Sequence, residues 1–210
     1  MSWQGSEDFL RRISTRLIEP EETRDLPVTG DFGTATAANK TLRDAGVLIC
    51  VVDRDDDDLN IILTERPKSM PTHPGQVALP GGKVDRTDAG PVAAAIREAE
   101  EEIGLNPDDV EIVGKSDLYL TRTGFSITPV IGLVPNDFVA NPDPHEVDDV
   151  FETPLSFLMN PDNHIKKSAL WQGSQRHYLE MPHNGRHIWG VTAGVIHALY
   201  ERLYKDEGKD

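Results

Sequence analysis

The sequence predicts an α/β fold, in which strands and a few long helices pack as a layered sandwich. Residues 47–52 (VLICVV) form an apolar run whose length suits a buried strand. Residues 91–104 place apolar side chains at helical spacing, and so do residues 192–204.

The predicted elements run from an N-terminal helix to a C-terminal helix. A short amphipathic helix is predicted over residues 6–19, followed by an acidic, weakly patterned arm over residues 20–40. The folded core starts near Ala45. Strands are predicted at residues 47–52, 60–65, 77–79, 110–113, 117–120, 127–134 and 146–151. A short helix near residues 154–158 and a hairpin around His183-Asn184-Gly185 precede the terminal helix.

This order predicts three segments along the chain. An N-terminal helix and extended arm occupy residues 1–40, the main domain occupies residues 41–206, and a short tail occupies residues 207–210. A chain of 210 residues is long enough to form one domain with a substantial hydrophobic core.

The composition excludes several classes of partner. A net charge of −15 argues against nucleic acid and against an anionic membrane surface, because both would repel the chain. No apolar run approaches the ~20 residues of a spanning helix, and the N-terminus lacks a charged-then-apolar leader. The single Cys50 excludes an internal disulfide, and we interpret it as core packing. These features together predict a cytoplasmic protein.

An acidic face on the predicted helix is the most informative feature of the chain. Glu98, Glu101 and Glu102 stand at positions i, i+3 and i+4, so their carboxylates fall in one narrow sector. Like charges at these spacings cost about 0.2–0.5 kcal/mol per pair. A divalent cation would convert this repulsion into ligation, and an all-oxygen site suits Mg²⁺ or Mn²⁺. The alternative is an acidic helix face that is simply solvated.

The context of the helix favours the metal site. Gly81 and Gly82 precede it and allow the backbone to approach a ligand closely. A second, apolar sector of the helix is predicted to face the core roughly opposite the acids. Its members are Val92, Ile96, Ala99 and Ile103.

The segment resembles the signature of the Nudix hydrolases, Gly-x5-Glu-x7-Arg-Glu-U-x-Glu-Glu-x-Gly-U, where U is aliphatic. The matching residues are Gly82, Arg97, Glu98, Ala99, Glu101, Glu102, Gly104 and Leu105. Asp88 stands where the first glutamate belongs, and eight residues instead of seven separate it from Arg97. Both departures resemble the coenzyme A diphosphatase branch of the superfamily.

An upstream segment at residues 63–82 also resembles that branch. Its matches to the second motif of the branch are Leu63, Thr64, Arg66, Gly75, Pro80, Gly81 and Gly82. Pro71 replaces the arginine of this motif, which would have been a natural phosphate clamp. With downstream segments, the resemblance covers about residues 40–204.

The resemblance implies a Nudix α/β/α sandwich with a mixed sheet and a catalytic loop-helix-loop. It implies metal-dependent hydrolysis of a diphosphate linkage, with coenzyme A or acyl-CoA giving 3′,5′-ADP and (acyl-)phosphopantetheine. Pro71 keeps open another nucleoside diphosphate derivative as the substrate, such as ADP-ribose or a dinucleotide. A nucleotide-binding module without turnover is a third alternative, against which the intact acidic face argues.

The resemblance also implies roles for individual residues. Glu98 and Glu102 are the expected main ligands of Mg²⁺ or Mn²⁺, with Glu101 as a further ligand and a backbone carbonyl from Gly82. Arg97 is expected to orient the glutamates by ion pairing.

The general base is expected to be Glu101 or Glu146, the distal acid in PDPHEVDDV. His145 lies beside Glu146, and we interpret it as an exposed loop residue. The residues expected to contact the phosphates or the adenosine end of a small nucleoside diphosphate substrate are Arg66, His73, Gln76 and Arg122. The sequence leaves the oligomeric state open, a homodimer included.

Overall fold

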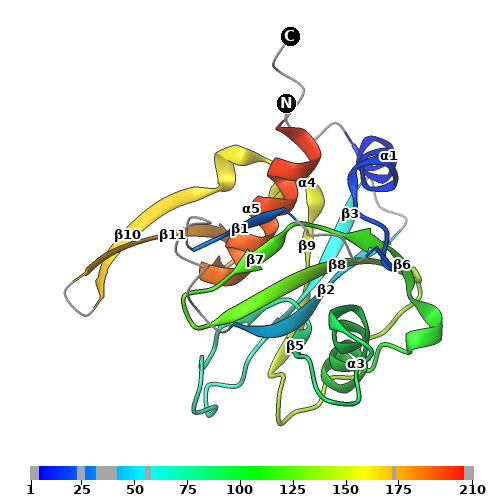
Figure 1. The fold of residues 1–210 in the computed structure, drawn as a ribbon, viewed down its shortest axis with the longest axis horizontal. Helices are drawn as coiled ribbons and strands as arrows, with labels where there is room; N and C mark the ends of the chain where they lie inside the picture. Colours follow the sequence, from blue (N-terminus) through cyan, green and yellow to red (C-terminus); the bar gives the residue numbers. More distant parts are fainter. Residues whose placement is uncertain (1–4, 23–26, 32–41, 55–57, 172–173, 206–210) are drawn as a thin grey trace.

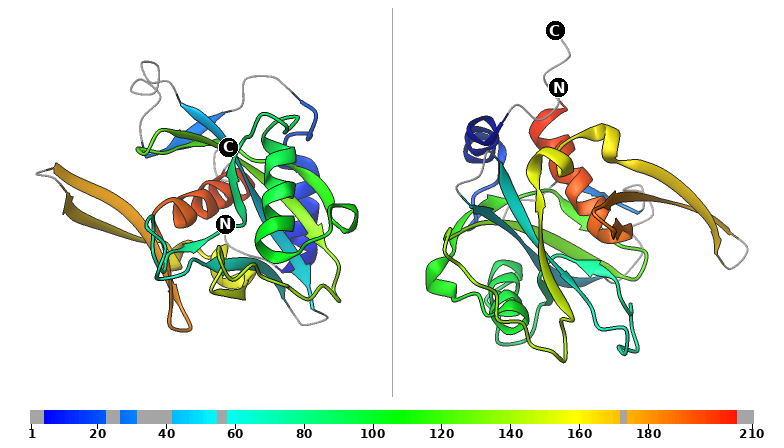
Figure 2. Two further views of the ribbon diagram at one scale, coloured as in Figure 1. Left: turned by 90° about the horizontal axis from the view of Figure 1, so that it is seen from below. Right: turned by 180° about the vertical axis from the view of Figure 1, so that it is seen from behind.

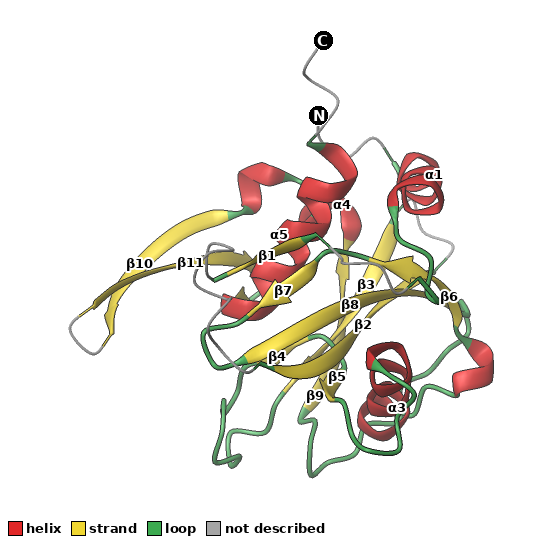
Figure 3. Cartoon of the chain, viewed as in Figure 1, coloured by secondary structure: helices red, strands yellow, loops and turns green. Residues whose placement is uncertain are grey.

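The computed structural model describes residues 5–22, 27–31, 42–54, 58–171 and 174–205, which fold around a mixed β-sheet (Figures 1 and 3). The strands are β1 Val28–Gly30, β2 Arg43–Asp53, β3 Leu59–Glu65, β4 Val77–Ala78, β5 Gly81–Lys83, β6 Glu111–Lys115, β7 Leu118–Leu120, β8 Phe125–Val134, β9 Asp149–Pro154, β10 Ile165–Trp171, β11 Ser174–His183 and β12 Arg186–Trp189. The α-helices are α1 Ser6–Arg16, α3 Pro91–Ile103, α4 Leu155–Leu158 and α5 Gly190–Tyr204, and the 3₁₀ turns are η1 Pro107–Asp109 and η2 Pro161–Asn163.

The main sheet is built around β2. This strand pairs in parallel with β8 and antiparallel with β3 and β5, while β9 pairs with β3 on its other side. Strands β10, β11 and β12 form a second, antiparallel sheet, whose β10–β11 hairpin projects from the body of the molecule (Figure 2).

Helices cover both faces of the main sheet, because successive side chains of a strand point to opposite faces. In β2, Ile49 and Val51 belong to the core that includes α1 and α5. Leu48, Cys50 and Val52 belong to the core that includes α3. This arrangement confirms the predicted α/β/α sandwich. Burial also raises the pKa of the Cys50 thiol, in keeping with its interpretation as core packing.

Helix α1 packs into the same core as the main domain. Phe9 and Ile13 are buried, and the Arg12 guanidinium lies 4.5 Å from the Tyr204 ring centroid. Arg12 Nη1 also donates to the Leu203 carbonyl at 2.9 Å.

The segment predicted as an extended arm contributes β1, which pairs in parallel with β7. Much of the rest of that segment, and all of residues 207–210, lie outside the described residues. The three predicted segments of the chain therefore stay a prediction.

Three sequence expectations need correction. The strand predicted at 146–151 begins at Asp149, so Glu146 lies in the preceding loop. Strand β10 was not expected, because its polar sequence IKKSALW lacks an apolar alternation. Helix α3 buries Ala94 and Ala95, with Ala99, Glu102 and Ile103, whereas Val92 and Ile96 are only partly buried. The close approach of α3 to the sheet selects alanine at its contact face.

Within the described residues, none of the helices combines the length and apolar character needed to cross a membrane.

Candidate active site

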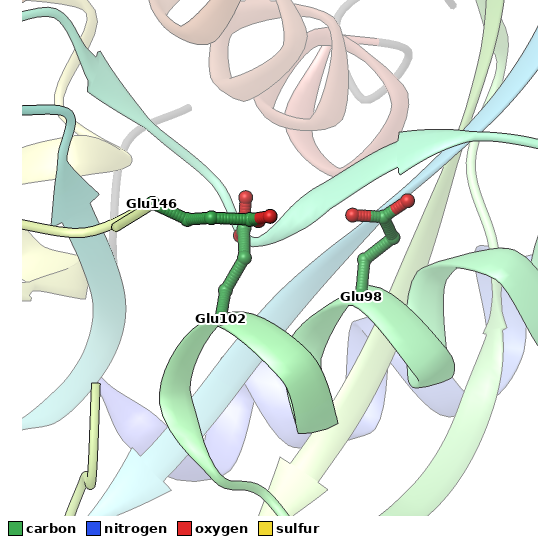
Figure 4. A group of neighbouring side chains, drawn as sticks. All are labelled: Glu98, Glu102 and Glu146. Carbon is green, nitrogen blue, oxygen red and sulfur yellow. The ribbon is translucent and has the colours of Figure 1, made fainter. Parts of the chain in front are cut away.

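Three carboxylates converge beside the C-terminal half of α3. Glu98 and Glu102 project from adjacent turns of the helix, and Glu146 reaches them from the loop that precedes β9 (Figure 4). One carboxylate oxygen from each lies within 4.8 Å of the other two, which is close enough for a shared cation. In the described part of the chain, this is the one group of three such side chains with metal-ligand spacing.

The approach of α3 to the sheet depends on glycine. A Cβ at Gly46 in β2 would lie 1.9 Å from the Pro91 carbonyl oxygen of α3. Gly46 pairs with Gly82 of β5, where a Cβ would lie 2.3 Å from Glu98 Oε1. Because neither residue has a side chain, the helix can lie on β2 and β5 with Glu98 directly over the Gly82 backbone.

Glu102 is an almost fully buried carboxylate, with 4% of its surface exposed. Its pKa is raised to about 8, mainly by burial and also by the nearby carboxylates of Glu98 and Glu146. A hydrogen bond of 3.1 Å from the Gly81 N–H to Glu102 Oε2 and the Arg66 charge oppose this shift. A buried carboxylate without a compensating cation is unfavourable, so this environment suits bound positive charge.

Glu98 is less buried than Glu102. Burial raises the pKa of Glu98, and the Arg97 guanidinium opposes the shift. Glu146 is exposed to solvent. The three acids therefore span the boundary between the core and solvent, where a cation could be held on one side and reached by a substrate on the other.

The loop carrying Glu146 is attached to the end of α3. The last carbonyl groups of a helix have no intrahelical partner. Here the N–H of Asn141 donates to the Ile103 carbonyl at 2.9 Å, and the N–H of Asp143 donates to the Glu102 carbonyl at 3.1 Å. The buried Val147 fixes the other side of the loop. These contacts bring a residue distant in sequence to the acidic face.

Arg97 connects several of the acidic residues. Its guanidinium donates to both carboxylate oxygens of Asp88, at 3.0 and 3.1 Å. Its Nη1 donates to Glu98 Oε1 at 3.0 Å and to Glu101 Oε2 at 2.8 Å. The pairing with Arg97 lowers the pKa of Asp88. Asp88, which replaces the signature glutamate, thus shares the Arg97 guanidinium with Glu98, and the orienting role of Arg97 stays a prediction.

Glu101 lies apart from the three converging carboxylates. Its side chain is 55% exposed, and its carboxylate accepts from Arg97. Its expected roles as a ligand and as a base stay predictions, as does the role of the Gly82 carbonyl. His145 is exposed, as expected, and its N–H donates to Asp143 Oδ1 at 2.9 Å.

A cavity of about 310 Å³ adjoins the carboxylates. Three of the four residues expected to contact substrate line it, namely Arg66, His73 and Gln76. Gly81 also lines this cavity, and its N–H is bonded to Glu102, so the cavity and the acidic cluster share a wall. Among the described residues, the buried Arg66 Nε has no hydrogen-bond partner, which makes it a donor suited to an incoming anion.

Arg122 does not line this cavity. Its side chain is exposed, and its backbone N–H donates to Asp31 Oδ2 at 3.1 Å. Its neighbours Thr121 and Thr123 line the cavity instead. The substrate-binding role of Arg122 stays a prediction.

Several lining residues were not expected from the sequence. Phe125 and Ile127 come from β8, and Val191, Thr192 and Val195 come from α5. Each has the local pattern of an ordinary core residue, and only the tertiary packing of β8 and α5 brings them to the same cavity. Thr192 Oγ1 makes part of this contact by donating to the Val77 carbonyl at 2.9 Å.

A larger cavity of about 600 Å³ lies beside the N-terminus of α3. None of the three carboxylates lines it. Of these two cavities, the smaller one is therefore the cavity that adjoins the acidic cluster.

The donor set fits a hard divalent cation. Three carboxylates supply only oxygen, the donor atom that Mg²⁺ and Mn²⁺ prefer. A positive charge at this point would also offset the free-energy cost of burying the Glu102 carboxylate and its repulsion from Glu98. Glu98, Glu102 and Glu146 are thus the residues that could hold such an ion.

The chain is similar to known proteins over most of its length. The NUDIX domain family matches residues 42–179. The chain is 38% identical to "Uncharacterized Nudix hydrolase NudL" of Enterobacter sp. (strain 638), over 92% of each protein. It is 39% identical to "Nudix hydrolase 15, mitochondrial" of Arabidopsis thaliana over 72% of its own length, and spans 55% of that protein. A crystal structure of a C. elegans Ap4A hydrolase binary complex is 20% identical, with a TM-score of 0.45, and the match covers 51% of this chain and 77% of that one.

The family match covers more than half of the chain, and both curated relatives are named Nudix hydrolases. This chain belongs to the Nudix hydrolases and is a diphosphatase.

Proposed function

We propose that this Nudix hydrolase cleaves the diphosphate linkage of coenzyme A or an acyl-CoA, giving 3′,5′-ADP and (acyl-)phosphopantetheine. At a coarser level, its reaction is hydrolysis of a nucleoside diphosphate derivative, and Nudix hydrolases generally use divalent metal ions. The observation that supports the proposal most directly is the shared wall between the acidic cluster and the cavity lined by Arg66. The resemblance of residues 63–82 and of Asp88 to the coenzyme A diphosphatase branch supports the choice of substrate.

The proposed chemistry divides among the residues of the site. Glu98, Glu102 and Glu146 would hold Mg²⁺ or Mn²⁺. When bound, such an ion neutralises diphosphate oxygens and lowers the pKa of a coordinated water. Arg97 keeps Glu98 oriented. Glu146, exposed at the mouth of the site, is our candidate for the general base. It would accept a proton from the attacking water as the water oxygen bonds to phosphorus and the phosphate leaving group departs.

Substrate binding is proposed for the cavity. Arg66 is placed to donate to phosphate oxygens, and His73 and Gln76 would contact the phosphates or the adenosine end. The apolar lining from β8 and α5 suits a base or an aliphatic chain.

A second candidate substrate class is favoured by Pro71. This residue lies exposed in the loop between Arg66 and Gln76, where the branch motif has an arginine. A proline ring cannot donate to a 3′-phosphate. ADP-ribose or a dinucleotide, which does not require that contact, is therefore the alternative substrate.

A substrate screen tests the proposal. Products would be separated by chromatography after incubation with coenzyme A, ADP-ribose, NADH and nucleoside triphosphates, each with Mg²⁺ and with Mn²⁺. Release of 3′,5′-ADP from coenzyme A as the preferred reaction supports the proposal. Preference for ADP-ribose or NADH would move the alternative class into first place, and no turnover of any substrate would favour a binding module.

We also propose that residues 41–206 form the hydrolase domain and that the protein assembles as a homodimer. Light scattering on the purified chain measures the assembly directly.

A further inference from the structure

Two acidic residues face each other at the end of the sheet nearest the active site. In the antiparallel pair of β3 and β9, Glu65 is directly opposite Asp149. Like charges in opposite positions of two strands repel. Glu65 is followed immediately by Arg66 of the cavity, and Asp149 follows the loop that carries Glu146. Separation of the strands here would therefore displace residues on both sides of the proposed site.

Arg186 of β12 lies between these two acids. Its Nη1 donates to Glu65 Oε2 at 2.5 Å, and its Nη2 donates to Asp149 Oδ2. The guanidinium also lies 4.6 Å from the ring centroid of Phe151 in β9. One planar cation thus joins the ends of two strands and covers a neighbouring aromatic ring.

The position of Arg186 is set by a tight hairpin turn. Asn184 and Gly185 both have positive φ angles, of 46° and 78°, as a two-residue hairpin loop of type I′ requires. Arg186 follows the turn directly and is paired with His183 of β11. The hairpin turn therefore fixes the point at which Arg186 of the second sheet meets the main sheet.

The backbone adds a further tie at the same place. The N–H of Asp148 donates to the Glu65 carbonyl at 2.8 Å, two residues after Glu146. This bond and the Arg186 bridge together hold the end of the loop that leads into β9. The contacts of Asn141 and Asp143 hold the start of the loop on α3.

We propose that Arg186 is a positioning residue for the reaction. By pairing with Glu65 and Asp149 together, it offsets their repulsion and keeps the end of the loop in the place from which Glu146 reaches Glu98 and Glu102. This inference rests on the proposed role of Glu146 in the site. Arg186 itself does not touch the acidic cluster and acts through the loop.

A positioning role and a purely structural role predict different measurements. The side chains of Arg186, Glu65 and Asp149 are 32%, 19% and 46% exposed. Ion pairs with this degree of exposure contribute little to stability, because water screens them. A structural role therefore predicts a small fall in melting temperature and unchanged kinetics. A positioning role predicts a fall in kcat and weaker metal binding at nearly unchanged melting temperature.

The test compares Arg186→Met with Arg202→Met. Arg202 pairs with Asp117 away from the site, with side chains 17% and 21% exposed, so its loss removes an ion pair at least as buried. We expect Arg186→Met to lower kcat by about 10- to 100-fold, the range expected when a group is misplaced by about 1 Å. We expect Arg202→Met to keep the wild-type kcat. Wild-type kcat and KM in Arg186→Met would overturn the proposal.

A rescue variant tests the electrostatic cause. In Arg186→Met/Asp149→Asn, the opposed charges are no longer alike, so most of the lost kcat should return, while Asp149→Asn alone should stay close to wild type. Failure of the double variant to recover would overturn the account of Arg186 as the cation that offsets the repulsion between Glu65 and Asp149.

Binding of Mn²⁺, measured by electron paramagnetic resonance of the free ion, separates this inference from the proposed function. Arg186→Met should weaken Mn²⁺ binding as Glu146→Gln does, whichever diphosphate the enzyme cleaves. If the wild type cleaves none of the tested diphosphates, the function fails while the Mn²⁺ comparison still decides the role of Arg186. Unchanged Mn²⁺ affinity in Arg186→Met, together with weaker Mn²⁺ binding in Glu146→Gln, would overturn the positioning role of Arg186.

Discussion

Gly82 lies directly beneath the carboxylate of Glu98, and a Cβ on that glycine would come within 2.3 Å of Glu98 Oε1. The atoms that would be displaced are the end of a flexible side chain, since Glu98 Cδ and Oε2 are the next nearest. The contact therefore sets the position of a carboxylate more than it sets the packing of the backbone. A glycine before the helix is thus a requirement of the site.

Gly82→Ala should separate function from stability. We expect turnover to fall by about 10- to 100-fold, because the Glu98 carboxylate must move by an ångström or more. The melting temperature should change little. Gly81→Ala is the contrasting variant, because its Cβ would meet the Gly46 carbonyl oxygen at 2.4 Å and its φ is 153°. It should lower the melting temperature strongly, and equal thermal effects of the two variants would contradict this assignment.

The stability of the metal-free enzyme should fall as pH rises. Glu102 has a pKa of about 8 in the folded protein against an ordinary value of 4.5, so the folded state binds the extra proton between these values. Stability contributed by the protonated carboxyl is complete below pH 4.5 and is lost as the pH rises to about 8. Each pKa unit corresponds to about 1.4 kcal/mol, so the trend is measurable by denaturant titration in EDTA.

Two controls identify Glu102 as the source of that trend. Glu102→Gln should flatten the dependence between pH 5 and 8, because its amide does not titrate. Saturating Mn²⁺ should flatten it in the wild type, because the ion replaces the proton. An undiminished slope in Glu102→Gln would assign the trend to another group.

Pro71 tests the choice of substrate. Arg66 and Gln76 are joined at the base of this loop, with the Arg66 N–H donating to the Gln76 carbonyl at 3.0 Å, so residue 71 lies on a loop anchored at the cavity. Pro71→Arg would restore a guanidinium, worth about 1.5–3 kcal/mol if it reaches a phosphate. We expect kcat/KM to rise more for coenzyme A than for ADP-ribose, which lacks the 3′-phosphate. An equal change for both substrates would mean that this position does not read the 3′-phosphate.

The acidic face of α3 could be predicted from sequence because its geometry is local. The spacing of Glu98 and Glu102 places both carboxylates on adjacent turns of any helix that forms there. The ion pair of Arg97 with Glu101 follows from the same spacing. The pairing of Arg97 with Asp88 depends on how the preceding loop turns, and residue order alone does not specify it.

The remaining parts of the site depend on contacts between distant segments. Glu146 reaches the cluster because its loop bonds to the last carbonyls of α3, which no periodicity reveals. The burial of Glu102 comes from the glycine-dependent contact of α3 with β5, so the sequence shows the acid but not its shifted pKa. Strand β10 has no apolar alternation and is specified by its pairing with β11.

The central claim is that Glu98, Glu102 and Glu146 bind the divalent ion on which turnover depends. The most direct measurement is Mn²⁺ affinity and kcat, determined together for Glu98→Gln and Glu102→Gln. The account predicts weaker Mn²⁺ binding and a fall in kcat by orders of magnitude. Metal-free stability should be unchanged, or slightly higher above about pH 8, where like-charge repulsion is removed. Near-normal turnover with unchanged Mn²⁺ affinity in both variants would contradict it.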